Sequence, residues 1–278
     1  MGDGPRAMVF TDLDGTLLDH HTYRWDPAVP ALEALRSRGI PVVLCSSKTR
    51  AEMTGVQRSL GLVGPMVVEN GGAVVSTGAG ELEQRFPERV DGLPAKVFGR
   101  AYGELRAALE RLGREVPGSL RGFGDMDDRE VARRTGLPVE GARLARRREY
   151  DEPFVWEPEP EPAAVEAARR ALARWGLRLT RGGRFWHLTG DNDKGRAVRW
   201  LTATAREAWG ERPRTLGLGD SENDLPMLLA VDRGVLVARP GGGHLSPRPA
   251  GVRTVPGVGP EGWNGAVLAW LRELEGGG

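Results

Sequence analysis

Short apolar runs alternate with helical patterns along the N-terminal part of the chain. Buried strands are predicted at 8–10, 41–45 and 66–69, where apolar residues follow one another without a helical period. Helices are predicted between them, one from Asp26 and Pro27 to a stop at Gly39, the other over 50–60. This alternation predicts an α/β fold with a parallel sheet and right-handed crossovers.

The pattern changes between about Gly80 and Thr189. Helices are predicted near 96–112, 128–135, 139–147 and 162–175, and strands at 154–156, 177–180 and 185–188. The last two strands are joined by Arg-Gly-Gly-Arg, which is typical of a hairpin because glycine supplies positive φ in the turn. Alternation then resumes, with helices at 196–209, 225–231 and 261–274 and strands at 215–219 and 234–237. We therefore predict a core formed by residues 1–79 and 190–278 and an inserted α+β domain at 80–189.

Composition narrows the class of protein. A chain of 278 residues can bury a sizeable core and form one large or two modest domains. Its 39 basic and 38 acidic residues balance, so no polybasic surface recommends nucleic acid or a membrane as a partner. The single cysteine, Cys45, lies in a predicted buried strand and cannot form an internal disulfide. Because the chain starts without the apolar core of a signal peptide and has no apolar run of membrane-spanning length, we expect a cytoplasmic protein.

Two aspartates follow the first predicted strand, in the run Asp-Leu-Asp-Gly-Thr at 12–16. Ligands of α/β proteins bind at the carboxyl ends of strands, and carboxylates this close repel unless a cation or a shared proton separates them. Asp-rich turns also cap helices, so Asp12 and Asp14 alone are moderately specific. A second predicted strand, at 215–219, ends in Gly219, and Asp220 and Asp224 follow it at the start of a helical segment. Oxygen donors at two strand ends of one sheet predict a Mg²⁺ site.

Lysine occurs only at positions 48, 96 and 194. Arginine occupies nearly all the remaining basic positions of the chain. A retained lysine therefore favours a role in which a compact ammonium serves better than a guanidinium. Lys194 directly precedes a predicted helix, and a solvated helix start is the alternative interpretation. Ser46, after the strand at 41–45, offers a hydroxyl and nearby backbone amides suited to a phosphate oxygen. Ser47 or Thr49 is predicted to cap the helix that follows.

These segments together resemble the four ordered motifs of the haloacid dehalogenase-like phosphatases. Further segments along nearly the whole chain are similar to the mannosyl-3-phosphoglycerate phosphatases within that superfamily. The resemblance implies a Rossmann-like core and an inserted cap of the larger C2 type, C2B-like, between the second and third motifs. The four motifs are Asp-Leu-Asp-Gly-Thr at 12–16, Ser46, Lys194 and Gly-Asp-Ser-Glu-Asn-Asp at 219–224; the family segments are Ser-Ser-Lys-Thr-Arg at 46–50, Glu-Asn-Gly-Gly at 69–72, Arg-Glu-Tyr-Asp-Glu-Pro-Phe at 148–154, Gly-Gly-Arg-Phe-Trp-His at 182–187 and Gly-Pro-Glu-Gly-Trp at 259–263.

The resemblance also implies a mechanism. Asp12 attacks phosphorus and becomes an aspartyl phosphate, and Asp14 protonates the leaving oxygen and then activates water. Lys194 and Ser46 hold the phosphoryl oxygens. The ligands implied for Mg²⁺ are Asp12, the main chain of Asp14, and Asp220. Asp224 is implied to orient the groups that surround the metal. The expected reaction is the hydrolysis of mannosyl-3-phosphoglycerate to phosphate and mannosylglycerate, a compatible solute.

Substrate choice is expected to come from the cap, since the four motifs meet only the phosphoryl group. A phosphorylated glyceryl glycoside offers a carboxylate and sugar hydroxyls, which favour an arginine fork and neutral hydrogen-bonding groups. Arg148 belongs to a charge run typical of a solvated surface, and His187 between apolar residues is equally typical of a buried histidine. The candidate substrate-binding residues are Glu69, Asn70, Arg148, Arg184, His187 and Asn223.

Three alternatives remain open from the sequence. The substrate can be another phosphorylated sugar, such as glucosyl-3-phosphoglycerate or sucrose phosphate. A hexose phosphomutase would keep the Asp12 phosphoenzyme but exclude water. A noncatalytic binding protein could retain the fold, although the complete set of matched catalytic groups argues against it. For the leading interpretation the expected partner is a small-molecule substrate, a phosphorylated sugar-glycerate.

Overall fold

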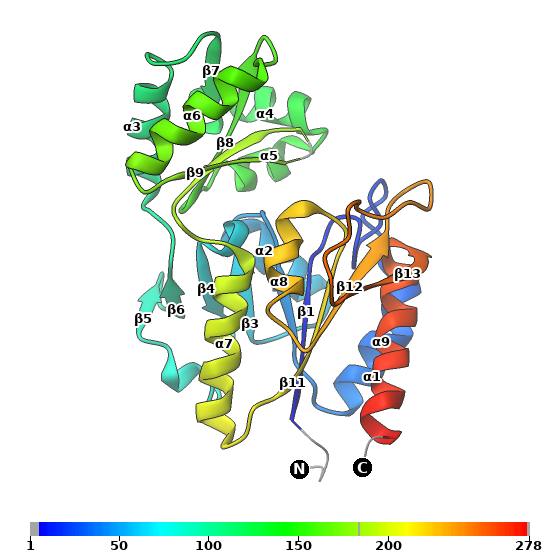
Figure 1. The fold of residues 1–278 in the computed structure, drawn as a ribbon. Coiled ribbons are helices and arrows are strands. Elements are labelled where there is room, and N and C mark those ends of the chain that lie inside the picture. Colours follow the sequence, from blue (N-terminus) through cyan, green and yellow to red (C-terminus); the bar gives the residue numbers. More distant parts are fainter. Residues whose placement is uncertain (1–5, 183, 277–278) are drawn as a thin grey trace.

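The computed structural model describes residues 6–182 and 184–276, so Gly183 of the predicted hairpin lies outside the described residues. Figure 1 shows two parts, one above the other. The larger part contains a nine-stranded sheet formed by β1 (Ala7–Thr11), β2 (Val42–Cys45), β3 (Pro65–Val68), β4 (Ala73–Ser76), β5 (Glu88–Val90), β6 (Leu93–Val97), β11 (Arg214–Gly219), β12 (Arg233–Ala238) and β13 (Val252–Val258). Its strand order is β13-β12-β11-β1-β2-β3-β4-β6-β5. The strands from β13 to β3 are parallel, whereas β4, β6 and β5 pair antiparallel.

Helices cover both faces of this sheet. Alternate residues of β1 point to opposite faces, as the two-residue period of a strand requires: Val9 packs in one apolar cluster and Phe10 in the other. The first cluster includes side chains of α1 (Val29–Ser37), α2 (Arg50–Ser59) and α9 (Gly259–Gly276). The second includes side chains of α7 (Lys194–Trp209) and α8 (Leu225–Leu228). Burial on both faces explains why these strands read as unbroken apolar runs.

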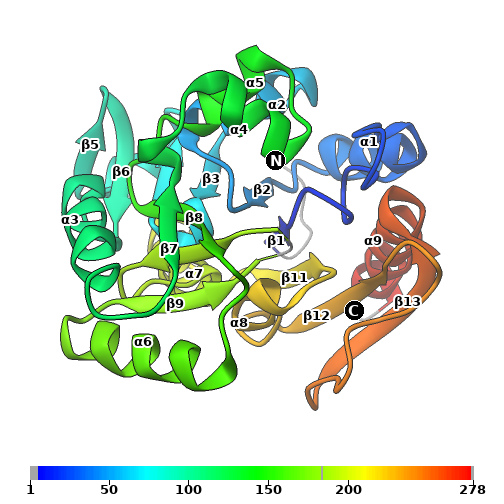
Figure 2. The ribbon, with the colours of Figure 1, turned by 90° about the horizontal axis from the view of Figure 1, so that it is seen from above.

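The smaller part is a four-stranded antiparallel sheet in the order β7-β8-β10-β9. Helices α3 and α6 pack with one apolar cluster of this sheet, and α4 and α5 with another. Seen from above in Figure 2, α5 lies beside α2, and Thr49 Oγ1 donates a hydrogen bond of 3.0 Å to the carbonyl oxygen of Leu144 there. The elements are β7 (Ser119–Gly122), β8 (Asp151–Glu157), β9 (Arg178–Arg181), β10 (Trp186–Thr189), α3 (Tyr102–Leu112), α4 (Asp128–Thr135), α5 (Val139–Ala145) and α6 (Pro162–Arg174).

The predicted α/β architecture with a parallel core is confirmed, and so is the hairpin of β9 and β10. The helix predicted at 96–112 is wrong at its start, because 93–97 form β6 and pair with β4. Strands β5 and β6, within 88–97, also pair in the larger sheet, although the inserted domain was predicted to start at residue 80. The strands of the smaller sheet all come after Val97 in the chain. The α-helix predicted from Asp26 begins at Val29, after a 3₁₀ turn that contains Pro27.

Two smaller predictions also have an outcome. Cys45 is buried in β2 and is a free thiol. None of the helices in the described ranges combines the length and the apolar character needed to cross a bilayer.

Candidate active site

Four candidate residues directly follow neighbouring strands. Asp12 follows β1, Ser46 follows β2, Glu69 follows β3 and Asp220 follows β11. Since these strands run parallel, their carboxyl ends lie at one edge of the sheet. Figure 1 shows this edge facing the smaller part of the molecule. The loops of the larger sheet and the inner face of the smaller part thus enclose the candidate site.

Lys194 joins the two aspartate motifs. Its Nζ donates hydrogen bonds of 2.7 Å to Asp12 Oδ1 and 2.6 Å to Asp224 Oδ1, and the lysine side chain is fully buried. Asp193 caps α7 by accepting a hydrogen bond of 2.7 Å from the backbone N–H of Arg196, which fixes where Lys194 starts the helix. The buried ammonium therefore connects two motifs that are far apart in the sequence. The alternative interpretation, in which Lys194 is a solvated residue at a helix start, is excluded.

Carboxylate oxygens of Asp12, Asp220 and Asp224 all lie within 4.8 Å of one another. Asp224 is fully buried, and its Oδ2 accepts hydrogen bonds from the backbone N–H groups of Asp220 and Ser221, each at 3.1 Å. Both Asp224 oxygens are thus occupied by protein groups. The turn at Gly15 also approaches closely: a Cβ there would lie 3.2 Å from Asp220 Oδ2, and its φ of +81° suits glycine.

The electrostatics of this cluster favour an additional positive charge. Burial and the charge of Asp224 raise the pKa of Asp12 well above its usual range, although Lys194 opposes the shift. Burial and Asp224 likewise raise the pKa of Asp220 to about 6. Burial lowers the pKa of Lys194, but its attraction to Asp12 and Asp224 outweighs burial and leaves that pKa raised. Three carboxylates against one ammonium leave an excess of negative charge, which a divalent cation bound by oxygen would offset.

Asp14 forms an ion pair with the lysine of the Ser-Ser-Lys-Thr segment. Lys48 Nζ lies 2.7 Å from Asp14 Oδ2, whereas the buried Oδ1 of Asp14 has no hydrogen-bond partner among the described residues. Burial lowers the pKa of Lys48, but the charges of Asp14 and Glu52 outweigh it and the pKa is raised overall. Ser46, also buried, accepts a hydrogen bond of 3.2 Å from the backbone N–H of Lys48. Thr49 is the N-cap of α2, as predicted.

A pocket of about 230 Å³ opens next to Asp14. It lies between the loops that follow β1 and β2 and the inner side of the smaller part of the molecule. The two parts contribute different groups: the core supplies two carboxylates, an ammonium and the imidazole of His20, and the smaller part supplies two guanidinium groups and the imidazole of His187. Its charged and aromatic lining includes Asp14, His20, Tyr23, Lys48, Glu52, Phe123, Arg148, Arg184, Phe185 and His187.

Three candidate substrate-binding residues line this pocket. The side chain of Arg148 is 7 % exposed and donates to the carbonyl oxygens of Ala145 and Ser47, at 2.7 and 2.8 Å, so it does not belong to a solvated charge run. Arg184 is exposed and donates to the carbonyl oxygen of Thr135. His187 is half-buried, and its Nδ1 lies 2.9 Å from the fully buried Asp151 Oδ2.

Glu69, Asn70 and Asn223 lie instead at the junction of the two parts of the molecule. Glu69 is fully buried and accepts hydrogen bonds from the backbone N–H groups of Glu149, at 2.9 Å, and Tyr150, at 2.8 Å. Its predicted binding of sugar hydroxyls does not fit this position. Asn70 donates to Asp151 Oδ2 at 3.1 Å and accepts from Asn223 Nδ2 at 3.2 Å, so these side chains already bind protein groups.

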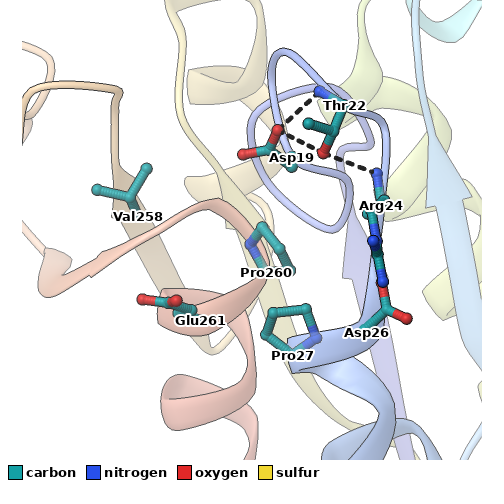
Figure 3. A pocket seen from close by; sticks show the side chains of 8 residues that line it. All are labelled: Asp19, Thr22, Arg24, Asp26, Pro27, Val258, Pro260 and Glu261. Atoms are coloured by element: carbon teal, nitrogen blue, oxygen red, sulfur yellow. Dashed lines mark hydrogen bonds and ion pairs between the residues drawn. The ribbon is translucent and has the colours of Figure 1, made fainter.

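Another hollow, of about 350 Å³, lies between the loop after β1 and the N-terminus of α9 (Figure 3). Its lining includes the carboxylates of Asp19, Asp26 and Glu261. Its one basic side chain, Arg24, is paired with Asp26 at 2.9 Å. This hollow is therefore unfavourable for a phosphate group, and the pocket beside Asp14 is the better candidate.

Sequence reasoning did not assign Lys48 or Asp151 to the site. The lysine argument applied to Lys194 applies equally to Lys48, because both are retained in an arginine-rich chain. Asp151 lies in the family-like segment at 148–154, but its contacts with Asn70 from the core and with His187 from β10 become visible only in the folded chain.

Comparisons with known proteins agree with this geometry. Residues 9–90 match the model of the haloacid dehalogenase-like hydrolase family. A glucosyl-3-phosphoglycerate/mannosyl-3-phosphoglycerate phosphatase of Methanococcoides burtonii is 42% identical over 95% of this chain and 96% of its own length. A phosphatase with the same name from Persephonella marina is 37% identical over 96% of this chain and 98% of its own. The fold also matches a crystal structure from Thermoplasma acidophilum, with a TM-score of 0.67, 21% identity and coverage of 97% and 99%.

Proposed function

The chain belongs to the haloacid dehalogenase-like phosphatases, and from its similarity to glucosyl-3-phosphoglycerate/mannosyl-3-phosphoglycerate phosphatases we propose that it hydrolyses the phosphate ester of these two glycosyl phosphoglycerates. It is a phosphoric monoester hydrolase, as its relatives are. The observation that carries the proposal is the placement of Lys194 between Asp12 and Asp224, beside Asp220 and the pocket next to Asp14.

Asp12 is the proposed nucleophile. Lys194 holds its Oδ1, while its Oδ2 makes no hydrogen bond to any described residue and is available for attack on phosphorus. The new oxygen–phosphorus bond forms as the ester bond to the glycerate oxygen breaks, which gives an aspartyl phosphate. A water molecule then attacks phosphorus, inorganic phosphate leaves and the carboxylate is regenerated. Two steps replace a single displacement whose uncatalysed rate is among the slowest known.

Asp14 is the proposed proton carrier. It follows the nucleophile by two residues and lines the pocket, where the glycerate oxygen of a bound substrate would lie. In the first step it gives a proton to that leaving oxygen, and in the second it takes one from the attacking water. Lys194 and Ser46, both buried at this edge of the sheet, are the proposed partners of the phosphoryl oxygens, on which negative charge is concentrated.

The donor set fits a Mg²⁺ ion. The carboxylates of Asp12 and Asp220 and the main-chain oxygen of Asp14 would hold it, because hard oxygen ligands and an excess of negative charge are what this ion requires. When bound, the ion would neutralise charge between the nucleophile and the phosphate. Asp224, whose two oxygens already bind Lys194 and backbone N–H groups, fixes the geometry around the ligands rather than adding a free oxygen.

Phosphate release from a panel of substrates tests the proposal. The panel consists of mannosyl- and glucosyl-3-phosphoglycerate, sucrose phosphate, hexose phosphates and an aryl phosphate, each with Mg²⁺ and after chelation. The two glycosyl phosphoglycerates should be hydrolysed with the highest kcat/KM, chelation should stop turnover, and Asp12→Asn should remain folded but inactive. Equal kcat/KM across the panel would contradict the proposed substrate class. Isomerisation of a hexose phosphate without phosphate release would identify a mutase.

A further inference from the structure

We propose that Lys48 forms a subsite for the carboxylate of the substrate, adjacent to the position of the phosphoryl group. The inference rests on the proposed function, because a glycosyl phosphoglycerate carries a carboxylate that simple sugar phosphates lack. It goes beyond that function by naming the side chain that distinguishes the two classes of phosphate ester.

The position of Lys48 suits this role. The residue lies between β2 and α2, and its Nζ is 2.7 Å from Asp14 Oδ2. The side chain is 14% exposed and lines the pocket that Asp14 also lines. The ring of Tyr23 lies 5.6 Å from the ammonium, where its face adds a favourable cation–π interaction. The ammonium is therefore held at the wall of the pocket, beside the group proposed to protonate the leaving oxygen.

The ammonium also has unused hydrogen-bonding capacity. A lysine Nζ carries three N–H donors, and within the described ranges Lys48 Nζ makes one hydrogen bond, to Asp14. None of the neighbouring cations Lys194, Arg148 and Arg184 is paired with Asp14 among the described residues. Lys194 binds two carboxylates. Arg148 donates from Nε and Nη1 to carbonyl oxygens, and Arg184 donates to another. Of these four cations, Lys48 alone combines contact with Asp14 and two free donors.

The chemistry of the substrate places its carboxylate near these donors. In a 3-phosphoglycerate unit the carboxyl carbon is separated by a single carbon atom from the carbon that bears the ester oxygen. If the phosphoryl group lies at Asp12 and the ester oxygen near Asp14, the carboxylate must lie close to the side chain that contacts Asp14. Without Lys48 this anion would face the carboxylates of Asp14 and Glu52, which also line the pocket.

The test compares two substrates that differ in one group. One is mannosyl-3-phosphoglycerate, and the other is its analogue with a hydroxymethyl group in place of the carboxylate. Lys48→Met removes the charge with little change in length, and Lys48→Gln serves as the second variant if the melting temperature shows that the first does not fold. Lys96→Met is the matched control, because Lys96 lies on β6 and does not line the pocket.

The wild-type enzyme should prefer the carboxylate substrate in kcat/KM. Lys48→Met should lower kcat/KM for the carboxylate substrate on the order of 100-fold, because a charge-assisted hydrogen bond to the carboxylate is lost. The loss of kcat/KM for the analogue should be smaller by a factor of about ten or more. Lys96→Met should leave the preference unchanged. Equal losses on both substrates would overturn the subsite and show that Lys48 acts only through Asp14. A wild-type enzyme that hydrolyses both compounds equally would overturn the subsite but leave the phosphatase function, whereas hydrolysis of neither would remove the proposed function and the subsite together.

Discussion

The indole Nε1 of Trp263 donates a hydrogen bond of 2.9 Å to Oγ1 of Thr11, the residue that precedes the proposed nucleophile. Thr11 Oγ1 in turn donates to the carbonyl oxygen of Asp12 at 2.7 Å. Trp263 is fully buried on α9, so a helix at the C-terminal end of the chain supports the backbone of the first motif. This contact gives a physical reason for the Gly-Pro-Glu-Gly-Trp segment, which has no side chain in the pocket beside Asp14.

Trp263→Phe is expected to lower the free energy of unfolding by about 1–3 kcal/mol, because the buried hydroxyl of Thr11 loses its donor. It should also lower kcat, since the backbone of Asp12 is less firmly held. Urea denaturation and steady-state kinetics measure the two effects. Trp270→Phe is the control: Trp270 is also buried on α9, but its indole nitrogen donates to no described residue. If the two variants are equally active and equally stable, the contact between Trp263 and Thr11 has no such role.

Gly71 and Asp193 give a second prediction. A Cβ on Gly71 would lie 2.2 Å from the carbonyl oxygen of Asp193, and its φ is +86°. Gly71→Ala should therefore displace the start of α7 and with it Lys194, costing more than about 3 kcal/mol and most of the activity. Gly92→Ala isolates the cost of the backbone conformation, because Gly92 has a φ of +78° and a Cβ added there would meet nothing within 4 Å. That control should lose only about 1–2 kcal/mol and keep its turnover rate. Equal effects of both substitutions would show that the close approach to Asp193 is unimportant.

Glu69 should make stability depend on pH. Burial raises the pKa of its carboxyl group to about 8, while Arg148 opposes the shift. Since the unfolded chain loses this proton near pH 4.5, the folded chain binds more protons between about pH 4.5 and 8, and stability falls as the pH rises through that range. The contribution is fully present below that window and lost above it, on the order of 5 kcal/mol in total.

Glu69→Gln removes this titration. We expect the difference in unfolding free energy between wild type and Glu69→Gln to decrease from pH 5 to pH 8 and to stay constant above. Urea denaturation at a series of pH values gives the two curves directly. Parallel curves would mean that the Glu69 carboxyl is ionised throughout in the folded protein.

Arg184→Ala should affect the natural substrate selectively. Arg184 lines the pocket but lies on the hairpin of the smaller part, away from the motifs at the strand ends. Its loss should reduce kcat/KM for a glycosyl phosphoglycerate by about tenfold and leave an aryl phosphate nearly unaffected, because only the former reaches the hairpin. Arg181→Ala, an exposed arginine of β9 that does not line this pocket, is the control. Equal losses on both substrates would remove Arg184 from substrate recognition.

The sequence predicted the larger features because their signals are local. Unbroken apolar runs identified the parallel strands, and the rule that ligands bind at strand ends brought Asp12, Ser46 and Asp220 to one edge. Residues 96 and 97 were assigned to a helix because the pairing of β6 with β4, which overrides local propensity, cannot be read from neighbouring residues. Glu69 was expected to bind sugar hydroxyls at a strand end, because its partner, the backbone N–H of Glu149, is 80 residues away in sequence. The pairing of Lys48 with Asp14 likewise depends on the folded positions of two loops.

The central claim is that Asp12 carries the phosphoryl group between substrate and water. The most direct measurement is to quench the enzyme with acid during turnover of mannosyl-3-phosphoglycerate, reduce acyl phosphates with borohydride and locate the product by mass spectrometry of peptides. The account predicts that Asp12 is converted to homoserine only when substrate is present, and that Asp12→Asn shows no modified residue. Modification at another carboxylate, or active turnover with no trapped acyl phosphate under any quench time, would contradict it.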